Sequence, residues 1–247
     1  MRIYVEFEGK DPIVVNINYN RAVNHFIYSI LDSEEYRDFL TNQAYKADGR
    51  IFKFFTFSRL QGDFKVFEKK GQKVMLFSNT VRLIISSPVE AFISSFIKGI
   101  LKKNTIDFCG NEVFLKRVDL WQQKGFKNRC IIKMLTPVVV YRKDLKTVLN
   151  RRFLSPFEED FEMVIKENIK SKLKALDITT EKFDFSIKPL NVIEEKDKKI
   201  IKISNDFVIG WMGKYLIEGT KETIEIAYYS GLGAKNSLGF GMFDIVA

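Results

Sequence analysis

A glycine-rich segment near the C-terminus is the stretch of the chain best suited to chemistry. It reads Gly231-Leu232-Gly233-Ala234-Lys235-Asn236-Ser237-Leu238-Gly239-Phe240-Gly241, with four glycines in eleven residues. Because glycine has no Cβ, backbone N–H groups in such a segment can approach an anion closely. Lys235, Asn236 and Ser237 would add one positive charge and two hydrogen-bonding side chains. The segment predicts a phosphate-binding site, and a helix cap followed by a tight turn is the alternative that glycine alone would explain.

Two familiar phosphate-binding motifs do not fit this segment. Lys235 is not followed by Ser or Thr at the spacing of a Walker phosphate loop. A strand, not a helix, is predicted after the segment, which excludes a dinucleotide-binding fingerprint.

Residues 121–153 concentrate positive charge. The whole chain has 40 Lys and Arg against 31 Asp and Glu, a formal net charge of +9. Residues 121–153 hold nine of these basic residues, beginning with Lys124, Lys127 and Arg129, against the single acid Asp144. Such a cluster indicates contacts with phosphate groups, although a solvated strand-and-loop face explains it equally well.

Composition narrows the class of protein. A length of 247 residues suits one large domain or two of ordinary size. No run of about 18 apolar residues is present, and the first residues are unlike a secretory signal. Cys109 and Cys130 lack paired metal-binding spacing, and His25 is the single histidine. We therefore expect a cytoplasmic protein with no membrane partner, no cofactor and no metal site.

Hydrophobic periodicity predicts the elements that position these segments. The first half contains strands at 3–7, 51–58, 73–78 and 112–120, and helices at 20–31 and 87–101. The second half contains strands at 130–141, 182–189, 200–217 and 240–246, and helices from 155 and at 220–230. Each half has the order β-α-β-β-α-β. The predicted fold class is α+β, with two tandem ferredoxin-like domains at residues 1–122 and 123–247.

Two of the predicted helices carry a sequence signal for their start. Ser87-Pro88-Val89-Glu90 and Ser155-Pro156-Phe157-Glu158 both match a capping box with proline at the first helical position. In the helix at 20–31, the core stripe centres on Val23, Ile27 and Ile30. Arg21, His25 and Tyr28 lie together on the opposite face.

The glycine-rich motif also carries a resemblance to a known family. GLGAKNSLGFGMF resembles the C-terminal glycine-rich motif of the CRISPR repeat-processing endoribonucleases of the RAMP superfamily, the Cas six family. The resemblance extends over the whole chain. It includes the two ferredoxin-like domains, an early helix with Phe26-Ile27-Tyr28, and the Phe54-Phe55-Thr56-Phe57-Ser58 strand that follows.

The resemblance implies a function. Members of this family cleave precursor CRISPR RNA within its repeats by attack of a ribose 2′-OH, without a metal ion. The products carry a 2′,3′-cyclic phosphate and a 5′-OH. The implied partner is CRISPR repeat RNA, subunits of a CRISPR effector complex are a further implied partner, and the implied state is a monomer or homodimer.

The resemblance also implies catalytic residues. Tyr28 matches the family's tyrosine on the first helix, and Lys53 matches its lysine. The family's histidine is missing, because residues 39–49 contain none. His25, three residues from Tyr28 on one helix face, is the substitute acid or base. An ordinary exposed histidine is the alternative, and the helix pattern alone would favour it.

Three functions remain open from the sequence. The first is a working endoribonuclease for CRISPR repeat RNA. The second is a non-catalytic family member that binds repeat RNA without cutting it, because the usual histidine is absent. The third is a RAMP subunit of a guide-RNA effector, which the compact chain and paired domains favour less.

Overall fold

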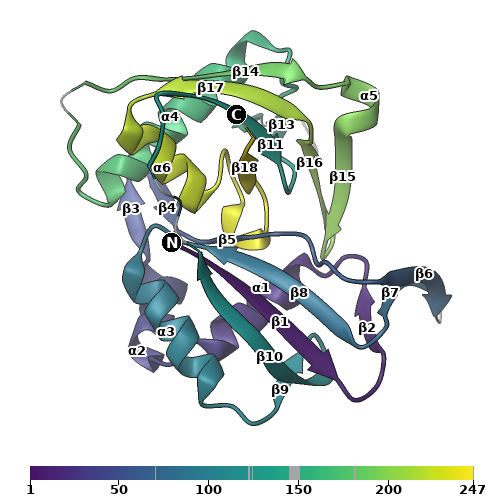
Figure 1. Cartoon of the computed structure of the whole chain (residues 1–247). Coiled ribbons are helices and arrows are strands. Elements are labelled where there is room, and N and C mark those ends of the chain that lie inside the picture. The colour runs from purple at the N-terminus through teal and green to yellow at the C-terminus, as the bar shows by residue number, and fades with distance from the viewer. Residues whose placement is uncertain (70, 122, 124, 145–150, 181, 247) are drawn as a thin grey trace.

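The computed structural model describes residues 1–69, 71–121, 123, 125–144, 151–180 and 182–246. The chain forms an N-terminal domain, at the bottom of Figure 1, and a C-terminal domain above it. None of the helices within these ranges is long and apolar enough to cross a membrane.

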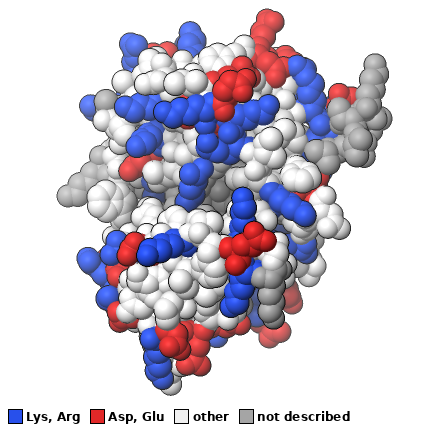
Figure 2. Space-filling model, turned by 90° about the vertical axis from the view of Figure 1, so that its right-hand side faces the viewer, with Lys and Arg blue, Asp and Glu red and all other residues white. Residues whose placement is uncertain are grey.

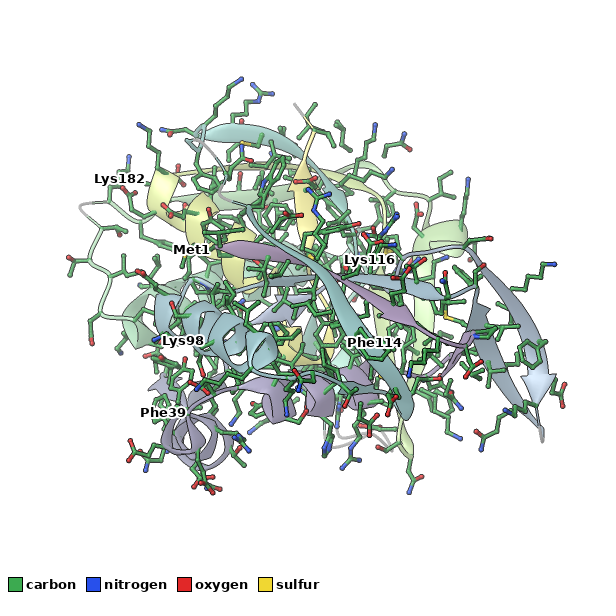
Figure 3. The ribbon with its side chains drawn as sticks, turned by 60° about the horizontal axis from the view of Figure 1, so that its bottom comes forward. Met1, Phe39, Lys98, Phe114, Lys116 and Lys182 are labelled. Carbon is green, nitrogen blue, oxygen red and sulfur yellow. The ribbon has the colours of Figure 1, made fainter. Side chains whose placement is uncertain are left out.

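The N-terminal domain is built on an antiparallel sheet with the order β5-β8-β1-β10-β9. Its strands are β1 (Arg2–Gly9), β5 (Thr56–Phe57), β8 (Thr80–Ser86), β9 (Ile106–Phe108) and β10 (Asn111–Trp121). Its two main helices are α1 (Asn20–Ile30) and α3 (Glu90–Leu101), which share one apolar core with the sheet. In Figure 3, α3, which carries Lys98, lies close to the strand that carries Phe114 and Lys116.

The C-terminal domain repeats this arrangement. Its sheet has the order β14-β17-β11-β18. The strands are β11 (Arg129–Met134), β14 (Phe185–Asn191), β17 (Lys214–Gly219) and β18 (Phe243–Ile245), and the helices are α4 (Glu159–Ala175) and α6 (Lys221–Ser230). In both domains the third strand of the βαββαβ unit lies between the first and the second, and the fourth lies beside the first. The prediction of two tandem ferredoxin-like domains is confirmed.

Shorter elements are inserted between the main ones. In the N-terminal domain they are β2 (Ile13–Asn16), α2 (Glu34–Asp38), the π-helix η1 (Phe39–Gln43), β3 (Tyr45–Ala47), β4 (Arg50–Phe52), β6 (Phe64–Lys69) and β7 (Gln72–Phe77). In the C-terminal domain they are β12 (Tyr141–Lys143), β13 (Arg151–Phe153), α5 (Glu194–Asp197), β15 (Lys198–Ile203), β16 (Asp206–Trp211) and the 3₁₀-helix η2 (Asn236–Leu238). The predicted boundary after residue 122 stays a prediction.

Several predicted strands are wrong in their extent. The strand predicted at 51–58 is divided into β4 and β5, because Phe54 has a φ of +51° and turns the chain between them. The strand predicted at 200–217 is three strands, with Ser204 (φ +56°) and Gly213 (φ +107°) in the turns. The strand predicted at 130–141 ends at Met134, and the last strand covers only β18. Strong β-propensity marked these regions but did not reveal their turns.

The two predicted capping boxes have different outcomes. The Ser155 N–H donates to the Glu158 carboxylate at 2.8 Å, as in half of a capping box, but α4 begins at Glu159 with Glu158 as its N-cap, so Ser155 does not cap this helix. The box at Ser87 is wrong: the Ser87 hydroxyl donates to the Phe54 carbonyl at 2.6 Å and accepts from the Val89 N–H at 3.0 Å. This serine therefore links two segments of the N-terminal domain and does not cap α3.

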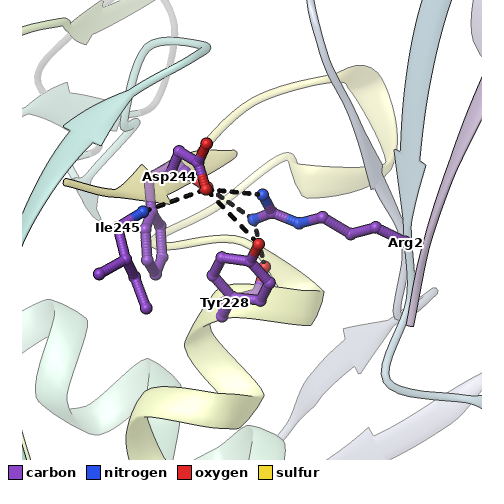
Figure 4. A network of polar contacts seen from close by, with 5 residues as sticks. Arg2, Tyr228, Asp244 and Ile245 are labelled. Carbon is purple, nitrogen blue, oxygen red and sulfur yellow. Dashed lines mark hydrogen bonds and ion pairs between the residues drawn. The ribbon is translucent and has the colours of Figure 1, made fainter. Parts of the chain in front are cut away.

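A buried arginine joins the two domains. Arg2, on β1, donates to the carbonyl oxygens of Tyr228 at 2.9 Å and Phe243 at 2.6 Å. Its guanidinium lies 3.4 Å from the Tyr228 ring centroid and 3.6 Å from the Asp244 carboxylate (Figure 4). Arg2 is only 3% exposed, so its charge depends on these partners in the other domain.

Replacing Arg2 should therefore loosen the domain junction. Arg2→Met keeps the apolar stem but removes a buried, hydrogen-bonded charge, so we expect a loss of about 2–4 kcal/mol in the free energy of unfolding. Urea unfolding measures this loss. Arg117→Met is the control, because Arg117 forms an exposed ion pair with Asp119 and should change the midpoint little. Equal midpoints for the two variants would contradict a role for Arg2 at the junction.

Candidate nucleic-acid interface

The glycine-rich segment, Gly231–Gly241, lies between the two domains. On the N-terminal side, the amides of Asn20 and Asn24 donate to the Leu238 and Ser237 carbonyls, both at 2.8 Å. The Thr56 hydroxyl donates to the Phe240 carbonyl at 3.0 Å. Helix α1 and strand β5 therefore hold the segment by its backbone.

Close packing accounts for the glycines. A Cβ on Gly239 would lie 2.3 Å from the Phe57 ring, and one on Gly233 would lie 2.3 Å from the Val139 carbonyl oxygen. A Cβ on Gly241 would lie 2.0 Å from the Leu232 carbonyl oxygen. Gly231 has a φ of +83°, which favours glycine. Contacts within the protein thus require glycine at positions 233, 239 and 241, and the backbone conformation favours it at 231.

The backbone N–H groups of three glycines are also used inside the protein. Gly231 donates to the Ala227 carbonyl, Gly239 to the Asn236 carbonyl and Gly241 to the Pro137 carbonyl, at 2.8–2.9 Å. These N–H groups are occupied and do not point freely at a phosphate. Contact between these glycines and RNA stays a prediction. Free backbone N–H groups, on which the prediction was based, are not found at these three glycines.

A buried lysine from the C-terminal domain binds the segment through hydrogen bonds. Lys172, on α4, donates from its Nζ to the Gly231 carbonyl at 2.6 Å and to Asn236 Oδ1 at 2.9 Å. Asn236 Nδ2 in turn donates to the Leu232 and Phe240 carbonyls at 3.0 and 3.1 Å. Both ends of the Asn236 side chain are engaged within the protein, so its clearest role is to shape the segment.

Sequence reasoning missed Lys172, although the sequence contains a signal for it. The residue is 1% exposed, and burial lowers the pKa of its ammonium group to about 7. It falls three residues after Ile169, on the apolar stripe of α4 that also contains Ile165 and Leu173. A lysine at a core position of an amphipathic helix is the signal that could have identified it.

A pocket of about 570 Å³ opens beside the segment, between the domains. Segments 49–55 and 139–143, helix α4 and the glycine-rich segment line it, and the central strands of the two sheets do not. Among the described residues, the charged side chains of its lining are Arg50, Lys53, Arg142, Lys143, Lys172 and Lys235, with Glu167 as the one acid. Such a charge balance suits a polyanion.

Two pocket residues have unusual backbone conformations. Lys235 has a φ of +60°, and its pKa is lowered by burial and by nearby Arg151. Phe54, in the 49–55 segment that also lines the pocket, has a φ of +51°. Left-handed conformations are costly for residues with a Cβ, and they gather at functional sites. Asn236 and Ser237 also line the pocket, so three of the predicted RNA-binding side chains border this space.

The predicted catalytic residues are only partly brought together. Lys53 lines the pocket, and its ammonium donates to the Leu40 and Thr41 carbonyls of η1. Burial, with nearby Lys46, lowers its pKa. Tyr28 packs edge-on against the ring of Phe55, a pocket residue, at 5.7 Å. Burial raises the pKa of Tyr28 to about 12.

His25, three residues before Tyr28 on α1, is not brought to the pocket with Lys53. Its side chain is exposed on α1, next in sequence to Asn24, and it does not line the pocket. Within the described ranges it forms no hydrogen bond or ion pair with Tyr28 or Lys53. Residues 39–49, where the family's histidine would be expected, form η1 and β3 and supply the carbonyls that hold Lys53.

The start of the basic region lies away from the pocket. Lys124 is outside the described residues. Lys127 is exposed, and Arg129 forms an ion pair with Glu218 at 3.2 Å, at the end of β11 remote from the glycine-rich segment. The later part of the region is at the pocket, through Arg142 and Lys143. Figure 2 shows Lys and Arg side chains over the upper, C-terminal domain and at the junction with the lower one.

Comparison with known proteins supports one family over both domains. Residues 14–119 match the family described as CRISPR-associated protein Cas6, N-terminal. Residues 121–245 match CRISPR associated protein Cas6, C-terminal.

Individual relatives agree with the family models. The chain is 28% identical to "CRISPR-associated endoribonuclease Cas6 1" of Methanocaldococcus jannaschii, over 98% of this chain and 91% of that protein. It is 26% identical to a "Putative CRISPR-associated endoribonuclease-like protein Cas6" of Pyrococcus furiosus, over 78% of this chain and 79% of that protein. A solved structure of a Cas6-related gene product from Pyrococcus furiosus superposes with a TM-score of 0.81 at 22% identity, covering 100% of this chain and 98% of the other. With its paired ferredoxin-like domains and its glycine-rich segment between them, the chain belongs to the Cas6 family of CRISPR-associated proteins.

Proposed function

We propose that this Cas6 protein is a metal-independent endoribonuclease that binds CRISPR repeat RNA and cleaves precursor CRISPR RNA. The observation that carries the proposal is the basic pocket beside the glycine-rich segment, which brings Lys53 and Lys235 to one space between the domains. The name of the Methanocaldococcus jannaschii relative, a CRISPR-associated endoribonuclease, supports the same activity.

The proposed reaction is an internal transesterification. The oxygen of a ribose 2′-OH attacks the adjacent phosphorus, and the bond from phosphorus to the 5′-oxygen breaks. The 2′-OH proton passes to a base, and the leaving 5′-oxygen gains a proton. The products are a 2′,3′-cyclic phosphate and a 5′-OH. The protein must align these groups and stabilise negative charge on the phosphorane.

Lys53 suits the role of charge stabiliser. Its hydrogen-bond acceptors are the neutral carbonyls of Leu40 and Thr41, so they leave its positive charge uncompensated. A phosphate that enters the pocket would be attracted by this charge.

Tyr28 suits a donor role. A pKa of about 12 keeps the phenol protonated at neutral pH, so it can orient the 2′-OH or protonate the leaving oxygen. His25 would be the second proton-transfer group. It follows Asn24, which contacts the glycine-rich segment, so RNA that crosses this segment would pass near it.

A second candidate function is binding of repeat RNA without cleavage. The position of exposed His25 outside the pocket favours it, because no histidine then lies beside Lys53 in the pocket. A cleavage assay distinguishes the two functions.

We expect wild-type protein to cleave labelled CRISPR repeat RNA in EDTA, at a rate measured with saturating enzyme in a single turnover. His25→Ala and Tyr28→Phe should each slow cleavage, by about 10²–10⁴-fold for a positioned acid or base, while RNA affinity is preserved. Lys53→Ala should also slow cleavage, and Lys53→Arg should restore part of the rate if charge alone matters.

Each outcome of this assay selects one function. Tight RNA binding by wild-type protein without cleavage would establish the binding-only function. Wild-type rates in His25→Ala would show that His25 is a surface residue.

We expect RNA affinity to depend on the lysines of the pocket. Lys235→Ala should weaken repeat-RNA binding and reduce the salt dependence of log K by about one counterion, because one phosphate contact is lost. Lys98→Ala, an equal charge change at an exposed position of α3, is the control and should leave the salt slope unchanged. Fluorescence anisotropy over a range of salt concentrations measures both.

Joint neutralisation of Lys124, Lys127 and Arg129 in the same assay tests the start of the basic region. A reduced salt slope would show that RNA contacts this part of the chain. Equal slopes for Lys235→Ala and Lys98→Ala would remove Lys235 from the interface.

A further inference from the structure

Lys172 is an ionisable side chain at a position that suits an apolar one. It lies on the apolar stripe of α4 and is 1% exposed. Among the residues that the structure describes, no carboxylate pairs with it, and its hydrogen-bond acceptors are Gly231 O and Asn236 Oδ1. Burying an ammonium group without a counter-charge is costly, whereas methionine would fill a similar volume. This free-energy cost indicates that Lys172 has a role other than filling space in the core.

The contacts of Lys172 with the glycine-rich segment and the pocket indicate this role. Both acceptors belong to the glycine-rich segment, and Lys172 also lines the basic pocket. The other charged groups around the pocket are Arg50, Lys53, Arg142, Lys143, Glu167 and Lys235. Glu167 is paired with Arg50 at 3.2 Å, and nearby Asp48 is bonded to Lys174 at 2.6 Å. Among the described residues, neither carboxylate is therefore free to balance the charge of Lys172, and a counter-charge would come from an anion bound in the pocket.

We propose that Lys172 is a positioning residue for RNA binding, whose buried ammonium holds the glycine-rich segment in its binding conformation and supplies positive charge beneath it. The bound phosphate groups of the RNA are the missing counter-charge. This inference rests on the proposed function, because it requires that RNA enters the pocket.

The proposal predicts opposite pH trends for binding and stability. In the free protein Lys172 is largely neutral above about pH 7, and bound phosphates would favour its charged form. RNA binding then takes up a proton, so affinity should fall as pH rises from 6 to 9, by at most about tenfold per pH unit. Stability should move the other way. The unfolded chain, with a lysine pKa near 10.5, binds more protons between pH 7 and 10, so the Lys172 contribution to unfolding free energy rises with pH.

The experiment compares Lys172→Met with Lys170→Met, an equal charge loss at an exposed position of the same helix. Repeat-RNA affinity is measured at pH 6, 7, 8 and 9, and urea unfolding at the same values. At pH 6, Lys172→Met should bind about tenfold more weakly than wild type, the scale of one hydrogen bond to a charged group. The affinity of Lys172→Met should also no longer fall as pH rises, whereas the affinity of Lys170→Met should fall as in wild type. Identical pH profiles for Lys172→Met and wild type would overturn the inference.

Two further outcomes keep this test decisive. If Lys172→Met does not fold, the wild-type profile decides: affinity that is constant from pH 6 to 9 overturns the role of Lys172. If wild-type protein binds no repeat RNA at any pH, the proposed function itself fails. Wild-type binding that Lys172→Met matches in strength and pH response refutes the inference about Lys172 alone.

Discussion

The close approach of the Gly231–Gly241 backbone to its surroundings is the constraint on which the rest of the structure depends. The segment passes between the domains at distances that leave no room for a Cβ at Gly233, Gly239 or Gly241. Its carbonyls accept from Asn20 and Asn24 on one side and from Lys172 on the other. The segment is therefore a rigid joint between two domains and, at the same time, the rim of the pocket that we propose for RNA. Rigid elements position binding groups more accurately than free loops do.

The electrostatics of the site follow from this joint. The segment draws Lys235 into a left-handed conformation on the pocket rim, and Lys53 faces the same space from the other domain. Arg2 holds the domains together elsewhere, so the positive charges of the pocket are kept close in spite of their repulsion. A preorganised cluster of like charges is unfavourable in the free protein and becomes favourable when a polyanion binds.

The sequence was informative wherever a pattern repeats along one element. The stripe of Val23, Ile27 and Ile30 located α1, and the repeated order of strands and helices indicated two domains. The strand predicted at 73–78 is β7, which pairs in a separate sheet, and the third strand of the first unit is β8. What it could not show are contacts between distant residues. Lys172 and Gly231 are 59 positions apart, and Arg2 alternates in β1 like any residue on an open sheet face. The sequence also placed His25 and Tyr28 on one helix face, but packing against Phe55 leaves Tyr28 half-buried and His25 exposed.

The measurement that tests the central claim most directly is a crystal structure with CRISPR repeat RNA that carries a 2′-deoxy nucleotide at the cleavage site. This substitution removes the attacking hydroxyl, so the intact RNA should remain bound. Our account predicts a backbone phosphate in the pocket, within reach of the ammonium groups of Lys53 and Lys235 and next to Ser237. RNA bound on another surface, with the pocket free of phosphate, would contradict it.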